Sequence, residues 1–249
     1  MAARTAKTAV VTGAASGIGR ACVARLLADG HRVAALDIGA LPVDLGAAAP
    51  DRFLALQADV GSLDSCQSAV AATVKRFGGL DWLAHFAAIH STETWRELDT
   101  ALFDRVLHVN VTGSYHIARA AAEHMAAHGG GAIVLTGSSS VNVSGVGGHG
   151  RGGPAYVTSK GAIIGLTRAL ARSLAPDNIR VNAVSPGSTE TPMTAEYDAD
   201  ARRKVAERTI LGRMGRPEEI AAVAVQLLSD DASYVTGEIV SASGGGGFG

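Results

Sequence analysis

The chain has 249 residues, of which 47% are hydrophobic and 18% are charged, so one domain spanning residues 1–249 can bury a large core. Its 22 basic and 23 acidic residues nearly balance without a run of one sign, which argues against nucleic acid and membrane surfaces as partners. The first seven residues are too polar for a secretory signal, so we expect a cytoplasmic protein that acts on a small molecule.

Short apolar runs alternate with longer amphipathic stretches along most of the chain. The runs predict strands at residues 8–12, 32–37, 53–57, 82–86, 132–136, 180–184 and 238–241. The amphipathic stretches predict helices at residues 17–29, 64–77, 100–128, 155–174 and 217–229. Because alternating strands and helices form parallel sheets, the predicted fold class is α/β. We expect a doubly wound Rossmann fold, with a seven-stranded parallel sheet and helices on both faces.

Two segments near the C-terminus depart from this alternation. Residues 189–216 are polar and rich in charge, a composition that favours a substrate lid within the single domain. The glycine-rich residues 244–249 are expected to form a surface tail.

A glycine-rich turn joins the first predicted strand to the first predicted helix. Its glycines allow a tight turn, and the helix that follows directs backbone N–H groups at an anion such as a pyrophosphate. The spacing is GxxxGxG, and a plain turn is the alternative interpretation. The candidate cofactor-binding residues of this turn are Gly13, Ser16, Gly17, Ile18 and Gly19.

Asp37 closes the second predicted strand, about 20 residues after the turn, where a carboxylate can accept hydrogen bonds from both adenosine ribose hydroxyls. The same charge repels a 2′-phosphate, and Ile38 follows it where a basic residue would compensate. The cofactor predicted is therefore NAD. The alternative is that Asp37 is only a turn residue before Gly39.

Tyr156 and Lys160 are four residues apart in a predicted helix, so their side chains share one face. The ammonium of Lys160 can then stabilise a phenolate. A tyrosine usually titrates near pH ~10, so a base that works at neutrality needs a pKa lower by about 3 units. Lys160 and a cationic nicotinamide together could supply that shift.

Taken together, these residues resemble the short-chain dehydrogenase/reductase family, in its 3-oxoacyl-reductase-like branch, over almost the whole chain. The similarity is carried by residues 12–19, Asp59-Val60 after the third strand, Asn110 within Val-Asn-Val-Thr-Gly, Ser138 after the fifth strand, Tyr156 with Lys160, Pro186-Gly187 leading to Thr191, and residues 235–240.

The resemblance implies hydride transfer between NAD(H) and a secondary alcohol or ketone, through a catalytic set of Asn110, Ser138, Tyr156 and Lys160. Ser138 would bind the substrate oxygen and Tyr156 would exchange its proton. Asn110 would anchor a water leading from Lys160, which would also hold the nicotinamide ribose. The family similarity also implies a homotetramer built through the two long central helices and the C-terminal strand region.

The resemblance implies further contacts with the cofactor. Asp59 and Val60 would flank adenine, and the backbone of Ala87 and Ala88 would lie near the cofactor. The remaining implied cofactor-binding residues are Pro186, Gly187, Thr189 and Thr191, of which the two threonines would fix the carboxamide.

Two departures from the family pattern affect the site. The fourth strand ends in His85-Phe86-Ala87-Ala88, where the family usually has Asn-Asn-Ala-Gly, so Phe86 removes a polar side chain near the cofactor. The span from Ser138 to Tyr156 is long and rich in glycine, which leaves Ser139 and Ser140 as alternatives to Ser138. The loop at residues 145–153, with His149 and Arg151, either borders the substrate pocket or is a flexible surface insertion.

Two other functions remain open at this stage. One is a nucleotide-sensing binding protein on the same fold, and the other is a non-redox enzyme, such as an epimerase or an eliminating enzyme, that keeps a bound dinucleotide. No metal site is expected, because His124 and His128 share a helix face without a third ligand. Cys22 and Cys66 lack metal-ligand spacing and are expected to be structural thiols.

Overall fold

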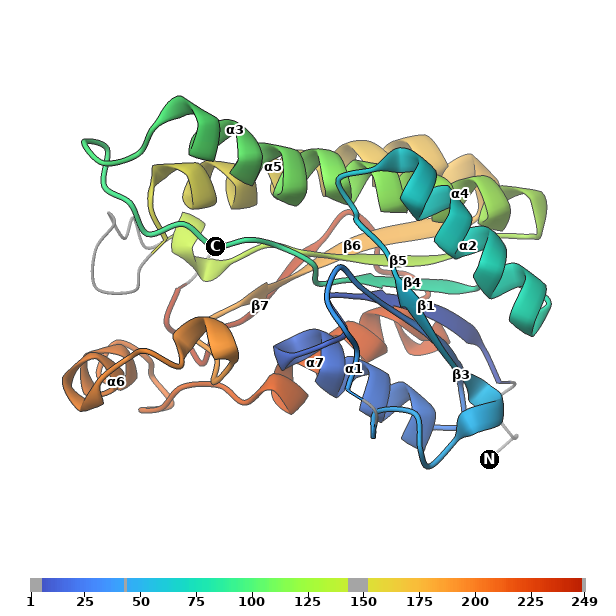
Figure 1. The fold of residues 1–249 in the computed structure, drawn as a ribbon, viewed down its shortest axis with the longest axis horizontal. Helices are drawn as coiled ribbons and strands as arrows, with labels where there is room; N and C mark the ends of the chain where they lie inside the picture. Colours follow the sequence, from blue (N-terminus) through green and yellow to red (C-terminus); the bar gives the residue numbers. More distant parts are fainter. Residues whose placement is uncertain (1–5, 43, 143–151, 248–249) are drawn as a thin grey trace.

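The computed structural model describes residues 6–42, 44–142 and 152–247. Within these residues, seven parallel strands form one sheet in the order β3-β2-β1-β4-β5-β6-β7, which confirms the predicted Rossmann-like fold (Figure 1). The strands lie within two residues of their predicted bounds: β1 (Thr8–Thr12), β2 (Arg32–Asp37), β3 (Phe53–Gln57), β4 (Trp82–His85), β5 (Gly131–Thr136), β6 (Ile179–Pro186) and β7 (Ile239–Ala242).

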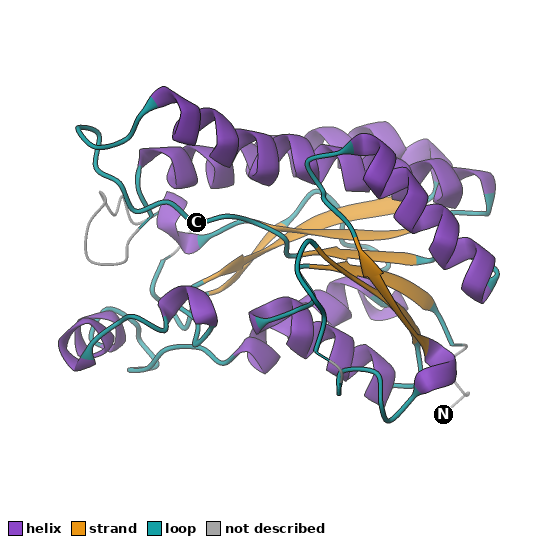
Figure 2. Cartoon of the chain, viewed as in Figure 1, coloured by secondary structure: helices purple, strands orange, loops and turns teal. Residues whose placement is uncertain are grey.

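Helices cover both faces of the sheet (Figure 2). One face carries α2 (Leu63–Phe77), α3 (Thr100–Leu107), α4 (Gly113–Ala127) and α5 (Pro154–Leu174), and the other carries α1 (Gly17–Ala28) and α7 (Pro217–Leu228). The central strands are buried on both sides because each face packs against its own apolar cluster. Alternate residues of β4 divide between the two clusters: Leu83 belongs to the first, and Trp82 and Ala84 belong to the second.

The helix predicted at residues 100–128 is interrupted. A π-helical turn, His108–Thr112, separates α3 from α4 and contains the buried Asn110. Such a turn inserts one extra residue into a helix, which a hydrophobic period of 3.6 does not reveal. The helical region was therefore predicted correctly, and its central irregularity was not.

The predicted lid, residues 189–216, contains ordered local structure. A 3-10 turn at Pro192–Thr194 is followed by helix α6 (Ala199–Ala206), whose N-terminus is capped by the carboxylate of Asp198. Residues 244–246 of the predicted surface tail are partly exposed, whereas Gly247 is buried. The Leu211 N–H donates to the Gly244 carbonyl, so the tail packs against the end of residues 189–216.

Both cysteines are buried and free. Burial raises the pKa of the Cys22 thiol to about 12 and that of the Cys66 thiol to about 11, so neither is a reactive thiolate at neutral pH. No helix in the described part of the chain has the length and apolar content needed to cross a membrane.

Candidate active site

Most predicted cofactor-binding residues lie at the carboxyl ends of β1, β2, β3, β4 and β6 or on the segments that follow them, whereas Tyr156 and Lys160 lie on α5 and Asn110 lies in the π-helical turn. The strand order reverses at β1, which pairs with β2 on one side and with β4 on the other. In doubly wound sheets, ligands bind outside the carboxyl ends of the strands at such a reversal. The topology therefore points to the same edge as the sequence motifs.

The glycine-rich turn after β1 has a shape that only glycine permits. Gly13 has φ +67°, and a Cβ there would lie 2.8 Å from the backbone nitrogen of Ala87. Gly17 has φ +52°, and a Cβ there would lie 3.1 Å from the Thr191 side chain. The turn is thus in close contact both with the loop after β4 and with the start of the lid.

Helix α1 begins at Gly17 with an uncompensated positive end. Ser16, at its N-cap, makes no side-chain capping bond, and the first turn, which includes Ile18 and Gly19, holds no acidic residue. Backbone N–H groups at this end therefore remain available, and with the helix dipole they form an anion site.

Asp37 takes the turn role considered for it from the sequence, and its geometry is compatible with the ribose role. Its Oδ2 accepts from the Ala15 N–H at 2.9 Å, and its Oδ1 accepts from the Gly39 N–H at 2.9 Å, so it orders the glycine-rich turn and its own turn. Each carboxylate oxygen keeps a second lone pair that can accept from a ribose hydroxyl. The next residue is Ile38, whose side chain is apolar and 66% exposed, so position 38 carries no basic side chain.

The remaining cofactor candidates occupy neighbouring loops. Asp59 is exposed and Val60 buried after β3, while Ala87 donates its N–H to Thr12 Oγ1. Beyond β6, the Thr189 hydroxyl donates to the Gly187 carbonyl. Pro186 ends β6, and Ala88 and Thr191 are partly buried.

The structure brings Ser138 to Tyr156. The Ser138 hydroxyl lies close enough to the Tyr156 phenol to lower its pKa by hydrogen bonding, and the Ser140 hydroxyl and N–H both donate to Ser138 Oγ, at 2.9 and 3.2 Å. Ser138 caps the short turn Ser139–Val141, which fixes its side chain. The geometry therefore favours Ser138 over its neighbours as the serine facing the phenol.

Burial raises the pKa of Tyr156 to about 12, although the bond from Ser138 opposes the shift and Tyr197 adds to it. Burial also lowers the pKa of Lys160 to about 8. The Lys160 ammonium lies 5.7 Å from the centroid of the Tyr156 ring and donates to the Thr136 carbonyl at 2.9 Å. Without a bound cofactor, the phenol is therefore protonated, and the downward shift expected from the sequence does not come from Lys160 alone.

Asn110 links the loop after β4 to helix α5. Its Oδ1 accepts from the Ile89 N–H at 2.8 Å, and its Nδ2 donates to the Ile89 carbonyl and to Ser159 Oγ. Ser159 in turn donates to the Tyr156 carbonyl at 2.7 Å. Through Ser159, Asn110 thus helps to hold the backbone of Tyr156 in place.

Two residues near Tyr156 were missed from the sequence. The His90 ring packs edge-on against the Tyr156 ring with centroids 4.5 Å apart, and Tyr197 of the lid is close enough to affect the pKa of Tyr156. His90 follows the carboxyl end of β4, so its position was a usable signal. Tyr197 lies in residues 189–216, for which no helix or strand was predicted.

Comparisons with known proteins agree with this geometry. A family model described as enoyl-(acyl carrier protein) reductase matches residues 13–246. A cis-4-hydroxycyclohexanecarboxylate dehydrogenase of Sinomonas cyclohexanicum is 40% identical, with 96% of each chain covered. An NAD-dependent glycerol dehydrogenase of Listeria innocua is 38% identical, with 97% of this chain and 94% of the relative covered. Among solved structures, a short-chain dehydrogenase/reductase from Brucella melitensis matches with a TM-score of 0.88 and 34% identity, over 98% of this chain and 97% of the other.

The chain belongs to the short-chain dehydrogenase/reductase family. It is an oxidoreductase that acts on alcohols or ketones, as the sequence predicted. Members of the family use nicotinamide cofactors, and the glycine-rich turn and the free helix end of this short-chain dehydrogenase/reductase fit the pyrophosphate of such a dinucleotide.

The departures from the family pattern have a limited effect on this short-chain dehydrogenase/reductase. Phe86 packs into the second apolar cluster, and the N–H groups of Phe86 and Ala87 both donate to Thr12 Oγ1, so the backbone after β4 is held without a polar side chain at position 86. Most of the predicted glycine-rich loop, residues 145–151 with His149 and Arg151, lies outside the described residues.

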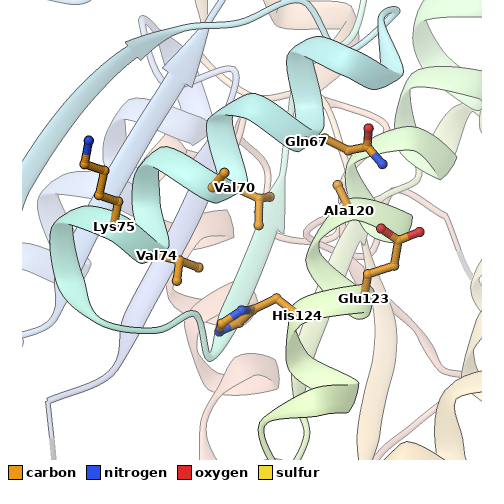
Figure 3. Close-up of a pocket in the computed structure, with 8 residues that line it drawn as sticks. Gln67, Val70, Val74, Lys75, Ala120, Glu123 and His124 are labelled. Atoms are coloured by element: carbon orange, nitrogen blue, oxygen red, sulfur yellow. The ribbon is translucent and has the colours of Figure 1, made fainter.

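One surface groove of this short-chain dehydrogenase/reductase lies away from the sheet edge. It has a volume of about 500 Å³ and lies between α2 and α4, where Val70, Val74 and His124 line it (Figure 3). None of the predicted site residues contributes to it, so the chemistry is assigned to the sheet edge and not to this groove. The His124 and His128 rings stack at 4.0 Å, and the described residues contain no group of three or more potential metal ligands.

Proposed function

We propose that this enzyme transfers a hydride between NAD(H) and a secondary alcohol or its ketone, with Tyr156 as the proton donor and acceptor. The observation that carries the proposal is the contact of Tyr156 with Ser138, beside Lys160 and the glycine-rich turn at one edge of the sheet. When bound, the nicotinamide would supply or accept the hydride, and the protein would handle the proton.

The chain's own residues would divide the remaining work. Ser138 would donate a hydrogen bond to the substrate oxygen, while Tyr156 Oη would give its proton to that oxygen during reduction. The raised pKa keeps the phenol protonated at neutral pH, so that the proton is present when the substrate oxygen becomes negative. In the oxidation direction, the positive charge of Lys160 would stabilise the phenolate, and Asn110 would keep the backbone of Tyr156 in place.

The preference for NAD over NADP is a further part of the proposal. Asp37 is positioned to accept from ribose hydroxyls and to repel a 2′-phosphate, and the Listeria innocua relative is named as NAD-dependent. The test compares the Kd of NADH with that of NADPH for wild type and Asp37→Asn. The wild type should bind NADH more tightly, and the neutral variant should lose most of that difference. Tighter binding of NADPH by the wild type would contradict the proposal.

We also propose that residues 189–216 act as a substrate lid, that the chain forms one cytoplasmic domain, and that it assembles as a homotetramer. Proximity of Tyr197 to Tyr156 supports the lid, since it brings this segment to the reacting group. Exposure of Tyr115 on α4 and of Tyr234 before β7 supports assembly, because both rings would gain from being covered.

The decisive experiment incubates a panel of cyclic and open-chain secondary alcohols with NAD and follows the formation of NADH. Stoichiometric NADH with one class of alcohol would support a dehydrogenase. Substrate conversion without net NADH would indicate a non-redox enzyme that returns the hydride. Tight NADH binding with no conversion of any alcohol or ketone would favour a nucleotide-sensing protein.

A further inference from the structure

Five buried polar side chains, from β4, the π-helical turn, α4 and α5, form a polar layer that is linked to Tyr156 through Ser159 and Lys160. Each is at most 3% exposed, and the five are His85, Asn110, Ser114, Ser159 and Lys160.

The periodicity of the elements explains why these residues meet. His85 is two residues beyond Leu83 on β4, so both face the same side of the sheet. Ser114 precedes Ile117 by three residues on α4, and Lys160 precedes Ile163 by three on α5, so each points the same way as its apolar neighbour. Leu83, Ile117 and Ile163 share the first apolar cluster. The polar layer therefore lies next to this cluster, one step nearer the carboxyl edge of the sheet.

The hydrogen bonds of Thr12 fix which nitrogen of His85 carries the proton. Thr12 Oγ1 accepts from the N–H groups of Phe86 and Ala87, at 3.1 and 3.2 Å, and lies 2.7 Å from His85 Nδ1. A hydroxyl has two lone pairs and one hydrogen, and the two backbone donors occupy both lone pairs. The Thr12 hydroxyl must therefore donate to Nδ1, which is then an acceptor. The neutral imidazole carries its hydrogen on Nε2.

This Nε2–H group is buried and has no hydrogen-bond partner among the described residues. A buried donor without an acceptor is strongly unfavourable, and such groups in native proteins are usually satisfied by an ordered water. Lys160 has capacity to spare, because it donates one of its three N–H groups to the Thr136 carbonyl.

We infer that His85 donates through Nε2 to a buried water that also accepts from Lys160, and that His85 is thereby a positioning residue for the Lys160 ammonium. The inference rests on the proposed function for its catalytic consequence, but not for the water site itself. The backbone already ties the same residues together, because the Thr136 hydroxyl donates to the His85 carbonyl at 2.6 Å. The water would add a second link, between the side chains of His85 and Lys160, and would hold the Lys160 ammonium close to the Tyr156 ring.

The first test needs no catalysis. In protein labelled with ¹⁵N-histidine, the signals of His85 are identified among the eight histidines by their loss in His85→Gln. They should report a neutral ring protonated on Nε2 at neutral pH. A high-resolution crystal structure of the wild type should contain a water within hydrogen-bond reach of both His85 Nε2 and Lys160 Nζ. A ring protonated on Nδ1, an imidazolium, or a site without this water would overturn the inference.

The second test uses two variants, each of which replaces the imidazole with an amide that places a polar atom near only one of the two ring nitrogens. His85→Asn places an amide oxygen near the Nδ1 position but cannot reach the water, whereas His85→Gln places an amide nitrogen near the Nε2 position. We expect His85→Asn to lower kcat by about tenfold with little change in KM, since one hydrogen bond is typically worth up to such a factor. His85→Gln should recover kcat to within about threefold of wild type on the same scale. Equal kcat values for the two variants would contradict the positioning role. Loss of activity in Tyr156→Phe tests the proposed function separately.

Discussion

Tyr156 stands in an environment that opposes ionisation of its phenol. Burial raises the pKa of the phenol, Ser138 partly offsets the rise, and the ammonium of Lys160 beside the ring has a pKa that burial lowers. A phenol in these surroundings keeps its proton at neutral pH. It becomes a good base only when a further positive charge enters the site.

Tyr156→Phe should lower kcat by at least 10²-fold, the smallest effect typical of a general acid or base, while the Kd of NADH changes little. The substitution removes the hydroxyl but keeps the ring and its contact with His90. Steady-state kinetics and NADH titration measure the two quantities. Retention of more than about a tenth of the wild-type kcat would rule out Tyr156 as the proton carrier.

Lys160→Met should impair both kcat and cofactor affinity, because one ammonium is proposed to stabilise the phenolate and to hold the ribose. Methionine fills most of the same buried volume, so the fold should survive. The same two measurements distinguish this variant from Tyr156→Phe. A normal Kd for NADH would show that Lys160 does not touch the cofactor.

His85 should also make the protein sensitive to acid. Burial, with a smaller contribution from Lys160, lowers its pKa from 6.5 to about 3. The unfolded chain binds a proton below pH 6.5 and the folded protein does not, so stability present above pH 6.5 is lost as the pH falls towards 3. The free energy of unfolding, measured in denaturant, should fall less steeply over this range in His85→Asn than in wild type. Parallel pH dependences would contradict the assignment.

At the scale of the elements, the sequence predicted regular structure better than irregular structure. The strands and most helices follow hydrophobic periods that survive folding, so their bounds agree within one or two residues. The π-helical turn at His108–Thr112 does not follow such a period, because its geometry depends on the bonds that Asn110 makes to Ile89 and Ser159. Helix α6 was missed because its surface carries charge on most sides and no residue of it is buried.

The same limit applies to the site. Tyr156, Lys160, Asp37 and the glycine-rich turn have spacings that a single sequence displays. The contacts of His90 and Tyr197 with Tyr156 join distant segments. The position of His90 after β4 indicates the edge of the sheet but not its contact with Tyr156, and the local sequence of Tyr197 indicates neither. Choosing Ser138 over Ser139 and Ser140 likewise required the turn geometry after β5.

Glu219, in the first turn of α7, forms hydrogen bonds with the end of the proposed lid, residues 189–216. Its carboxylate accepts two bonds from the Arg213 guanidinium and one from the Arg216 N–H, which hold its pKa at about 2. Since the folded pKa is lowered from 4.5, this contribution to stability is present above pH 4.5 and is lost as the pH falls through about 2.

Glu219→Gln should therefore loosen residues 208–216 at neutral pH. Limited trypsin digestion should cut after Arg208 or Arg213 faster in this variant than in wild type, because cleavage requires local unfolding. Glu218→Gln, in the same exposed turn, is the matched control and should digest at the wild-type rate. Equal digestion of all three proteins would mean that Glu219 does not restrain the lid.

At the scale of the whole molecule, the apolar side chains of helix α5 do not by themselves require assembly. Ile163 is buried within the chain, and Leu166 and Leu170 pack against the first apolar cluster, so these residues need no partner subunit. What remains for a partner is the outer surface of α4 and α5 with Tyr115, and the turn at Tyr234 beside the edge strand β7.

Light scattering should nevertheless give a mass near four times 25.2 kDa in dilute solution. Tyr234→Asp, which places a charge on a fully exposed ring position, should weaken the assembly if the C-terminal region forms a contact. A single species of monomer mass for the wild type would reject the homotetramer, and an unchanged mass for the variant would place the contact elsewhere.

The burial of both cysteines makes the enzyme suitable for fluorescence work on the lid. Cys22 and Cys66 are the only thiols in the sequence, and their raised pKa values keep them inert towards alkylating dyes. Ile210 is 73% exposed, near the point where the lid segment meets the C-terminal glycines. A cysteine introduced by Ile210→Cys would take up a single dye without removal of the native thiols, and the emission of that dye would report the motion of the lid in real time during turnover.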